Sequence, residues 1–126
     1  KSCLLACETA VDSIKNLPNI ITPFPGGVVR SGSKVGSKYK SLIASTNDAF
    51  CPTLYSITKS SLPANTGCVM EIVINGLTAH DISNATRVAI DSISLSKVKK
   101  DIITISAGNY GGKLGQHRFY LRKIMK

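Results

Sequence analysis

Apolar and polar residues alternate along the chain with two different periods, and each period predicts one type of element. Residues 4–15 carry apolar side chains every three or four positions, which is typical of an amphipathic helix that ends before Pro18. A second helix is expected from Thr78, because Thr78 and Asp81 have the spacing of a capping box. The apolar stripe of this helix consists of Ile82, Ala85, Ala89 and Ile93.

The remaining apolar runs predict five strands, at residues 20–22, 39–46, 68–74, 101–106 and 118–124. The Pro/Gly cluster 23–27 is expected to stop the first strand and turn the chain, and Asn75-Gly76 reads as a second turn. Residues 47–67 form a long connection with room for one helical turn. The element order predicts a single α+β domain over residues 1–126: a ferredoxin-like sandwich of mostly antiparallel sheet with two helices on one face.

Sixteen Lys and Arg against seven Asp and Glu give a net charge of +9, which favours anionic partners. Nucleic acid is not expected, since the three Phe and four Tyr lack the spacing of a base-stacking surface. No apolar run approaches the roughly 18 residues of a membrane span, so no membrane partner is expected either. A small anionic substrate fits the charge equally well.

The four cysteines, Cys3, Cys7, Cys51 and Cys68, could form two disulfides in an oxidising compartment. Cys3 and Cys7, however, share one helical stripe, where thiols behave as small apolar side chains. We therefore expect free buried thiols and a cytoplasmic protein. No metal site is expected, because the remaining two cysteines and both histidines are scattered singly along the sequence.

The segment 27–38 is rich in glycine, serine and basic residues and lies between two apolar runs. It is not a P-loop, because Ser33-Lys34 stands where Lys followed by Ser or Thr is needed. Its backbone, hydroxyls and cationic groups could hold a phosphate or carboxylate, and a solvated hairpin tip is the alternative. The candidate ligand-binding residues are Arg30, Ser31, Gly32, Ser33, Lys34, Ser37 and Lys38.

Glu71 interrupts an otherwise apolar strand, and a period of two places it on the face of Val69 and Val73. That face either meets water, where the carboxylate would pair with a lysine, or meets another lobe or subunit. In the second case desolvation favours the protonated form of the carboxyl group. A Cys or Ser nucleophile would need a nearby histidine, and neither His80 nor His117 is close to one in sequence.

Three blocks, at residues 21–47, 68–77 and 105–115, occur in the order found in formylmethanofuran:tetrahydromethanopterin formyltransferases. The chain resembles the C-terminal lobe of this family, which we take as the distal lobe, with the N-terminal lobe absent. The resemblance implies a homo-oligomeric enzyme of one-carbon metabolism whose cleft is lined by more than one lobe or subunit. It also implies tetrahydromethanopterin and formylmethanofuran as coenzyme substrates and no tightly bound cofactor.

The same resemblance implies roles for individual residues. Glu71 corresponds to the candidate general acid, and the segment containing Arg30 and Lys38 to a ligand-facing loop. Asn109 and Lys113, in the glycine-rich third block, would contact substrate. A catalytically silent lobe that only binds or assembles with other subunits is the alternative function, and a basic nucleic-acid-binding domain is a further, less favoured one.

Overall fold

The computed structural model describes residues 1–31, 48–108 and 116–126. Three α-helices occupy Ser2–Ile14 (α1), Ala79–Leu95 (α2) and Leu121–Ile124 (α3). The strands are Ile20–Ile21 (β1), Val28–Arg30 (β2), Met70–Ile72 (β3) and Asn75–Gly76 (β4). Short 3-10 turns lie at Pro25–Gly27 (η1), Asp48–Phe50 (η2), Pro52–Leu54 (η3) and Lys97–Asp101 (η4).

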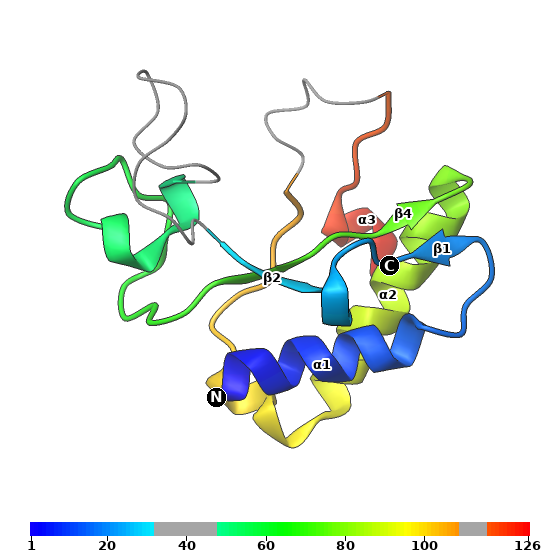
Figure 1. Cartoon of the computed structure of the whole chain (residues 1–126), viewed down its shortest axis with the longest axis horizontal. Coiled ribbons are helices and arrows are strands. Elements are labelled where there is room, and N and C mark those ends of the chain that lie inside the picture. The colour runs from blue at the N-terminus through cyan, green and yellow to red at the C-terminus, as the bar shows by residue number, and fades with distance from the viewer. Residues whose placement is uncertain (32–47, 109–115) are drawn as a thin grey trace.

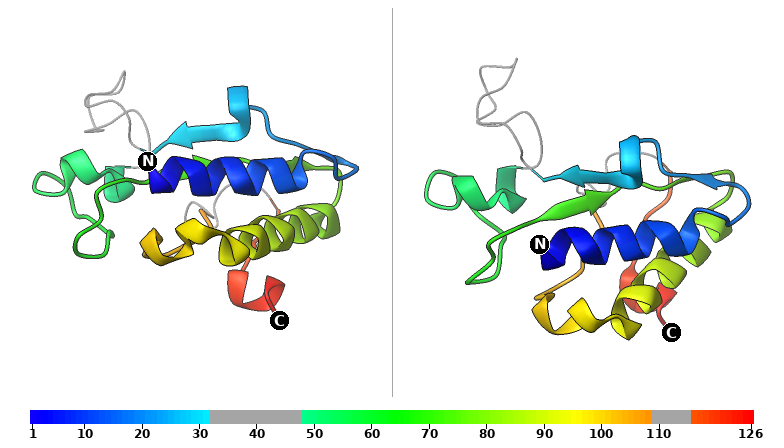
Figure 2. Two further views of the ribbon diagram at one scale, coloured as in Figure 1. Left: turned by 90° about the horizontal axis from the view of Figure 1, so that it is seen from below. Right: turned by 60° about the horizontal axis from the view of Figure 1, so that its bottom comes forward.

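The strands lie on one side of the two long helices, as Figure 1 and the turned views of Figure 2 show. β1 pairs with β4 and β2 with β3, both antiparallel. The predicted α+β class is therefore confirmed, and two helices on one face of antiparallel strands agree with the predicted ferredoxin-like sandwich.

Both strand pairs belong to one antiparallel ribbon formed by residues 19–31 and 69–77. Backbone hydrogen bonds from Leu77 N to Asn19 O (3.0 Å) and from Ser31 N to Val69 O (3.1 Å) extend the pairing at its two ends. Between the pairs, six residues (22–27) face only two (73–74), so residues 22–27 form a bulge that contains η1. The Pro/Gly cluster stops β1 and turns the chain at η1, as predicted, but after this turn the chain continues as β2 along the same partner segment.

Two glycines form the bulge, and both have the left-handed backbone that side chains disfavour: φ is +68° at Gly26 and +74° at Gly27. Their surroundings differ. A Cβ on Gly27 would lie 2.8 Å from both methyl groups of Val11 on α1, whereas one on Gly26 would meet nothing within 4 Å. Gly27 therefore lets the bulge approach α1 closely.

We expect Gly27→Ala to lower the free energy of unfolding by about 1–3 kcal/mol more than Gly26→Ala, the usual range for overpacking. Both glycines have a left-handed backbone, so the difference between the variants reports the crowding at Gly27 by Val11 and, at 3.2 Å, by the Thr22 hydroxyl oxygen. Chemical denaturation of the two variants and the wild type measures it. Equal losses would show that the close approach to α1 adds nothing.

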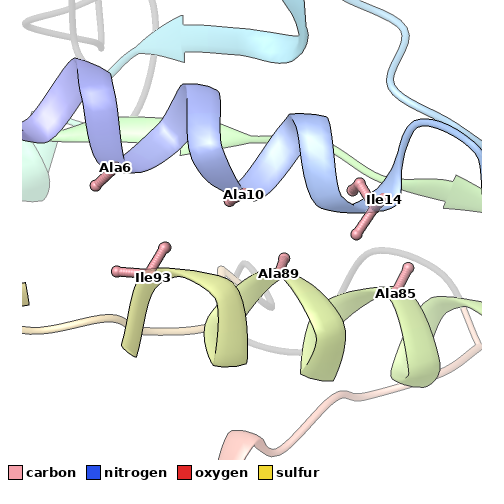
Figure 3. Packing of buried hydrophobic residues seen from close by; sticks show 6 residues of the cluster. All are labelled: Ala6, Ala10, Ile14, Ala85, Ala89 and Ile93. Atoms are coloured by element: carbon pink, nitrogen blue, oxygen red, sulfur yellow. The ribbon is translucent and has the colours of Figure 1, made fainter. Parts of the chain in front are cut away.

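The core lies between α1 and α2, which run antiparallel (Figure 3). Figure 3 shows Ala6 opposite Ile93, Ala10 opposite Ala89 and Ile14 opposite Ala85. All six side chains are buried, and each isoleucine faces an alanine, so large and small groups interlock. The ribbon closes this core from the other side through Ile20, Ile72 and Ile74.

The start of α2 is as predicted. Thr78 accepts a hydrogen bond from Asp81 N at 3.1 Å, and the Asp81 carboxylate accepts one from Thr78 N at 3.2 Å, which completes the capping box. Of the predicted stripe, Ala85, Ala89 and Ile93 are buried and Ile82 is half-buried. Gly76, predicted as a turn, instead pairs with Ile20, and a Cβ there would lie 2.7 Å from Ile82.

The last two predicted strands are wrong. Residues 102–108 form no strand, because β-branched residues favour an extended chain but a strand also needs a partner for its backbone groups. Leu121–Ile124 forms the short helix α3 beside α2, in keeping with the good helix propensity of Leu, Arg and Lys. The predicted strand 39–46 lies outside the described residues.

Candidate active site

Glu71 lies in the middle of β3, directly opposite Val29 of β2. Its neighbour Ile72 packs against the helical core, and successive side chains of a strand point to opposite faces. The Glu71 side chain therefore emerges on the face of the ribbon that is turned away from α1 and α2. It is half-buried there, and the strand alternation places Val69 on the same face.

Ser31 follows β2 directly and is a polar partner of Glu71. The Ser31 hydroxyl donates a hydrogen bond of 2.7 Å to Glu71 Oε1. Ser31 is only 2% exposed, so its hydroxyl needs a partner inside the protein. Two residues forty positions apart, both predicted as site residues, are thus brought into contact.

A cavity of about 210 Å³ is lined by Arg30 and Ser31 but not by Glu71, which is linked to it only through the hydrogen bond of the Ser31 hydroxyl. Its walls come from the ends of the ribbon and from the segment around η3, in particular Cys51, Pro52 and Thr53. Arg30 is exposed, so its guanidinium group is accessible to an anion from solvent. The sequence predicted residues 47–67 as a long connection and did not single out Cys51 or Thr53 as part of a site.

The remaining predicted site residues lie outside the described residues: Gly32, Ser33, Lys34, Ser37, Lys38, Asn109 and Lys113. Gly32 follows Ser31 in sequence, so the predicted ligand-binding segment starts at this cavity. The described part of the site combines a carboxyl group, a buried hydroxyl donor and a guanidinium. Such a set can transfer a proton and attract an anionic substrate.

All four cysteines are free, as predicted, but their burial differs from the expectation. Cys7 and Cys51 are buried, Cys3 is half-buried and Cys68 is exposed. Cys68 is also less isolated than its sequence position indicates, because it lies close enough to Cys3 to affect the pKa of that thiol. Burial and this neighbour raise the pKa of Cys3 to about 12, so Cys3 stays a neutral thiol near neutral pH.

A second, more open cavity of about 550 Å³ lies between α2 and the C-terminal segment. Both histidines line it, His80 from the start of α2 and His117 from the segment before α3, together with Arg87 and Lys123. No cysteine is among the described residues of its wall, so a Cys–His nucleophile gains no support there. No three or more His, Cys, Asp or Glu side chains gather to hold a metal ion within residues 1–31, 48–108 and 116–126.

The family model described as FTR, proximal lobe, matches residues 1–124. The chain belongs to this family. The predicted resemblance to a formyltransferase lobe is thereby confirmed, but its assignment as the distal lobe is wrong, because the matching family is that of the proximal lobe. Sequence order alone identified a C-terminal block and could not show how the two lobes are placed in the folded enzyme.

Among relatives, the formylmethanofuran–tetrahydromethanopterin formyltransferases of Methylobacillus flagellatus and Methylococcus capsulatus are 62% and 57% identical to this proximal-lobe chain. Each alignment covers 97% of the chain but only 40% and 41% of the relative. The chain therefore spans about two fifths of the length of the curated relatives it matches.

Comparison with solved structures also identifies formyltransferases as similar proteins. The formyltransferase/hydrolase complex (FhcABCD) of Methylorubrum extorquens, determined with methylofuran, matches with a TM-score of 0.83 at 44% identity. The formyltransferase of Methanosarcina barkeri matches with a TM-score of 0.80 at 46% identity. These matches cover 99% and 98% of the proximal-lobe chain and 41% of either structure, so the whole described fold is shared with formyltransferases.

In the described part of this proximal lobe, no helix is both long enough and apolar enough to cross a membrane. The longest, α2, has 17 residues and carries charged side chains such as Arg87 and Asp91.

Proposed function

We propose that this chain is the proximal lobe of an enzyme that transfers a formyl group between formylmethanofuran and tetrahydromethanopterin. Relatives that carry this activity in their names are up to 62% identical over nearly the whole chain. The observation that carries the chemistry is Glu71: a half-buried carboxyl on the face of the ribbon that the helices leave open, hydrogen-bonded to a buried serine. Another lobe or subunit would cover this face and exclude water from the reaction.

Glu71 acts in this proposal as the general acid. An amine nitrogen of tetrahydromethanopterin attacks the formyl carbon of formylmethanofuran, and a tetrahedral oxyanion forms. The bond to the methanofuran nitrogen then breaks; its electron pair stays on that nitrogen, which takes the proton of Glu71. The proton lost by the attacking amine restores Glu71, so the cycle is balanced and needs no covalent enzyme intermediate.

The basic segment next to the cavity supplies substrate binding. Arg30 and the neighbouring residues Gly32, Ser33, Lys34, Ser37 and Lys38 would hold an anionic part of a coenzyme through guanidinium, ammonium, hydroxyl and backbone N–H groups. Asn109 and Lys113 of the third sequence block would contact substrate as well. The two coenzymes are the substrates, and the proposal includes no tightly bound cofactor or metal.

The active unit would contain the N-terminal lobe and further copies of the same subunit, because this chain spans only about 40% of its relatives. A cytoplasmic location agrees with the four free thiols. Neither membrane nor nucleic acid belongs to the proposed partners.

The test is a comparison of the 126-residue chain with the protein that contains both lobes. We expect formyl transfer from formylmethanofuran to tetrahydromethanopterin in the two-lobe protein and none in the single lobe, since the cleft needs both. Equilibrium binding of each coenzyme to both proteins is measured alongside. A two-lobe protein that folds but binds neither coenzyme would favour the alternative of a silent assembly module.

A further inference from the structure

Ser31 is an unusual position for a small polar side chain. Together with Ile14 and Leu54, it is one of the largest fully buried side chains. The adjacent Arg30, in contrast, is exposed. A buried hydroxyl is destabilising unless it is hydrogen-bonded. The Ser31 hydroxyl donates its hydrogen bond to the carboxyl of Glu71, at 2.7 Å from Oε1.

The backbone on both sides of this contact is fixed. Ser31 N donates to Val69 O at 3.1 Å, and Val29 pairs with Glu71 in the β2–β3 ladder. With a period of two, Val29, Ser31, Val69 and Glu71 all lie on the same face of the ribbon. The Ser31 hydroxyl therefore crosses diagonally from one strand to the other, between two backbones whose register the ladder sets.

We propose that Ser31 is a positioning residue that holds Oε1 of Glu71, so that Oε2 carries the proton used in the reaction. The inference rests on the proposed role of Glu71 as general acid. A hydroxyl donates to either oxygen of a carboxylate and also to the carbonyl oxygen of a carboxylic acid. The bond to Oε1 can thus persist before and after proton transfer, and the side chain does not have to reorient.

This contact would also favour the reaction energetically. When Oε2 gives its proton to the departing nitrogen, negative charge spreads over both oxygens of Glu71. The Ser31 hydrogen bond then becomes charge-assisted and stronger than its neutral form. An interaction that strengthens along the reaction lowers the barrier, whereas one of constant strength does not.

The test uses the protein with both lobes and replaces Ser31 by Ala. We expect kcat to fall by about 10- to 100-fold, the value of a hydrogen bond to a charged group, with KM for both coenzymes unchanged. Ser31→Thr, which keeps the hydroxyl, should recover most of the activity; its fold is checked by thermal unfolding. Ser92→Ala is the matched control, because Ser92 also donates a 2.7 Å hydrogen bond but lies on α2.

A double-mutant comparison decides whether Ser31 acts through Glu71. In a Glu71→Gln background, Ser31→Ala should cause no further loss of kcat. An equal loss in both backgrounds, or a rise in KM with unchanged kcat, would overturn the positioning role and leave the proposed function intact. Unchanged turnover in Glu71→Gln itself would instead overturn the proposed function, and this inference with it.

Discussion

Replacement of Glu71 by Gln should lower the turnover of the two-lobe protein by at least about 10²-fold, the lower range of general-acid contributions. Glutamine has the size of glutamate, and its amide oxygen can still accept the Ser31 hydrogen bond, so the ribbon should stay folded. It cannot deliver an acidic proton to the leaving nitrogen. Steady-state kinetics with both coenzymes measures the effect, which should appear in kcat rather than KM.

Glu8→Gln is the control for this experiment, because Glu8 is the other glutamate of the chain and is exposed on α1. It makes the same chemical change on the helical side of the lobe and should leave turnover unaltered. Wild-type turnover in Glu71→Gln would remove Glu71 from the mechanism.

Replacement of Ile14 by Ala should lower the free energy of unfolding of the chain by about 2–5 kcal/mol. Ile14 is fully buried at the end of α1, and Figure 3 places it opposite Ala85 of α2. With alanine on both helices at this level, no large side chain remains to fill the space between them. Urea or thermal unfolding followed by circular dichroism measures the loss.

Two further variants separate a packing defect from other causes. Adding Ala85→Ile to Ile14→Ala restores the total side-chain volume from the opposite helix, and we expect it to recover part of the stability. Ile57→Ala, at a side chain that is 63% exposed, should change stability by less than about 0.5 kcal/mol. No recovery in the double variant would show that the loss does not arise from volume between α1 and α2.

Short sequence patterns correctly predicted those elements of the lobe that are stabilised by interactions between residues close in sequence. The Thr78–Asp81 capping box satisfies its own backbone groups within four residues, so the sequence alone fixes where α2 begins. The apolar stripe of α2 depends only on the period of a helix. In the same way, the period of a strand alone places Glu71 and Ile72 on opposite faces of β3.

The incorrect expectations concern interactions between distant segments. Gly76 reads as part of a turn, yet its backbone pairs with Ile20, because residues 19–31 supply a partner strand on the same side of the helices. Residues 102–106 have strand-forming side chains and form no strand. Cys68 is isolated in sequence but lies near Cys3, since β3 packs against α1.

The sequence by itself determined the α+β class, both long helices, the candidate acid Glu71 and the likeness to formyltransferases, because side-chain periodicity and short motifs are local properties of the chain. Only the tertiary structure decided that Ser31 meets Glu71 and that Arg30, Cys51 and Thr53 share one cavity. These contacts join residues 20 to 40 positions apart. Their register is set by the antiparallel ribbon and by the packing of α1 on α2, which no local pattern encodes.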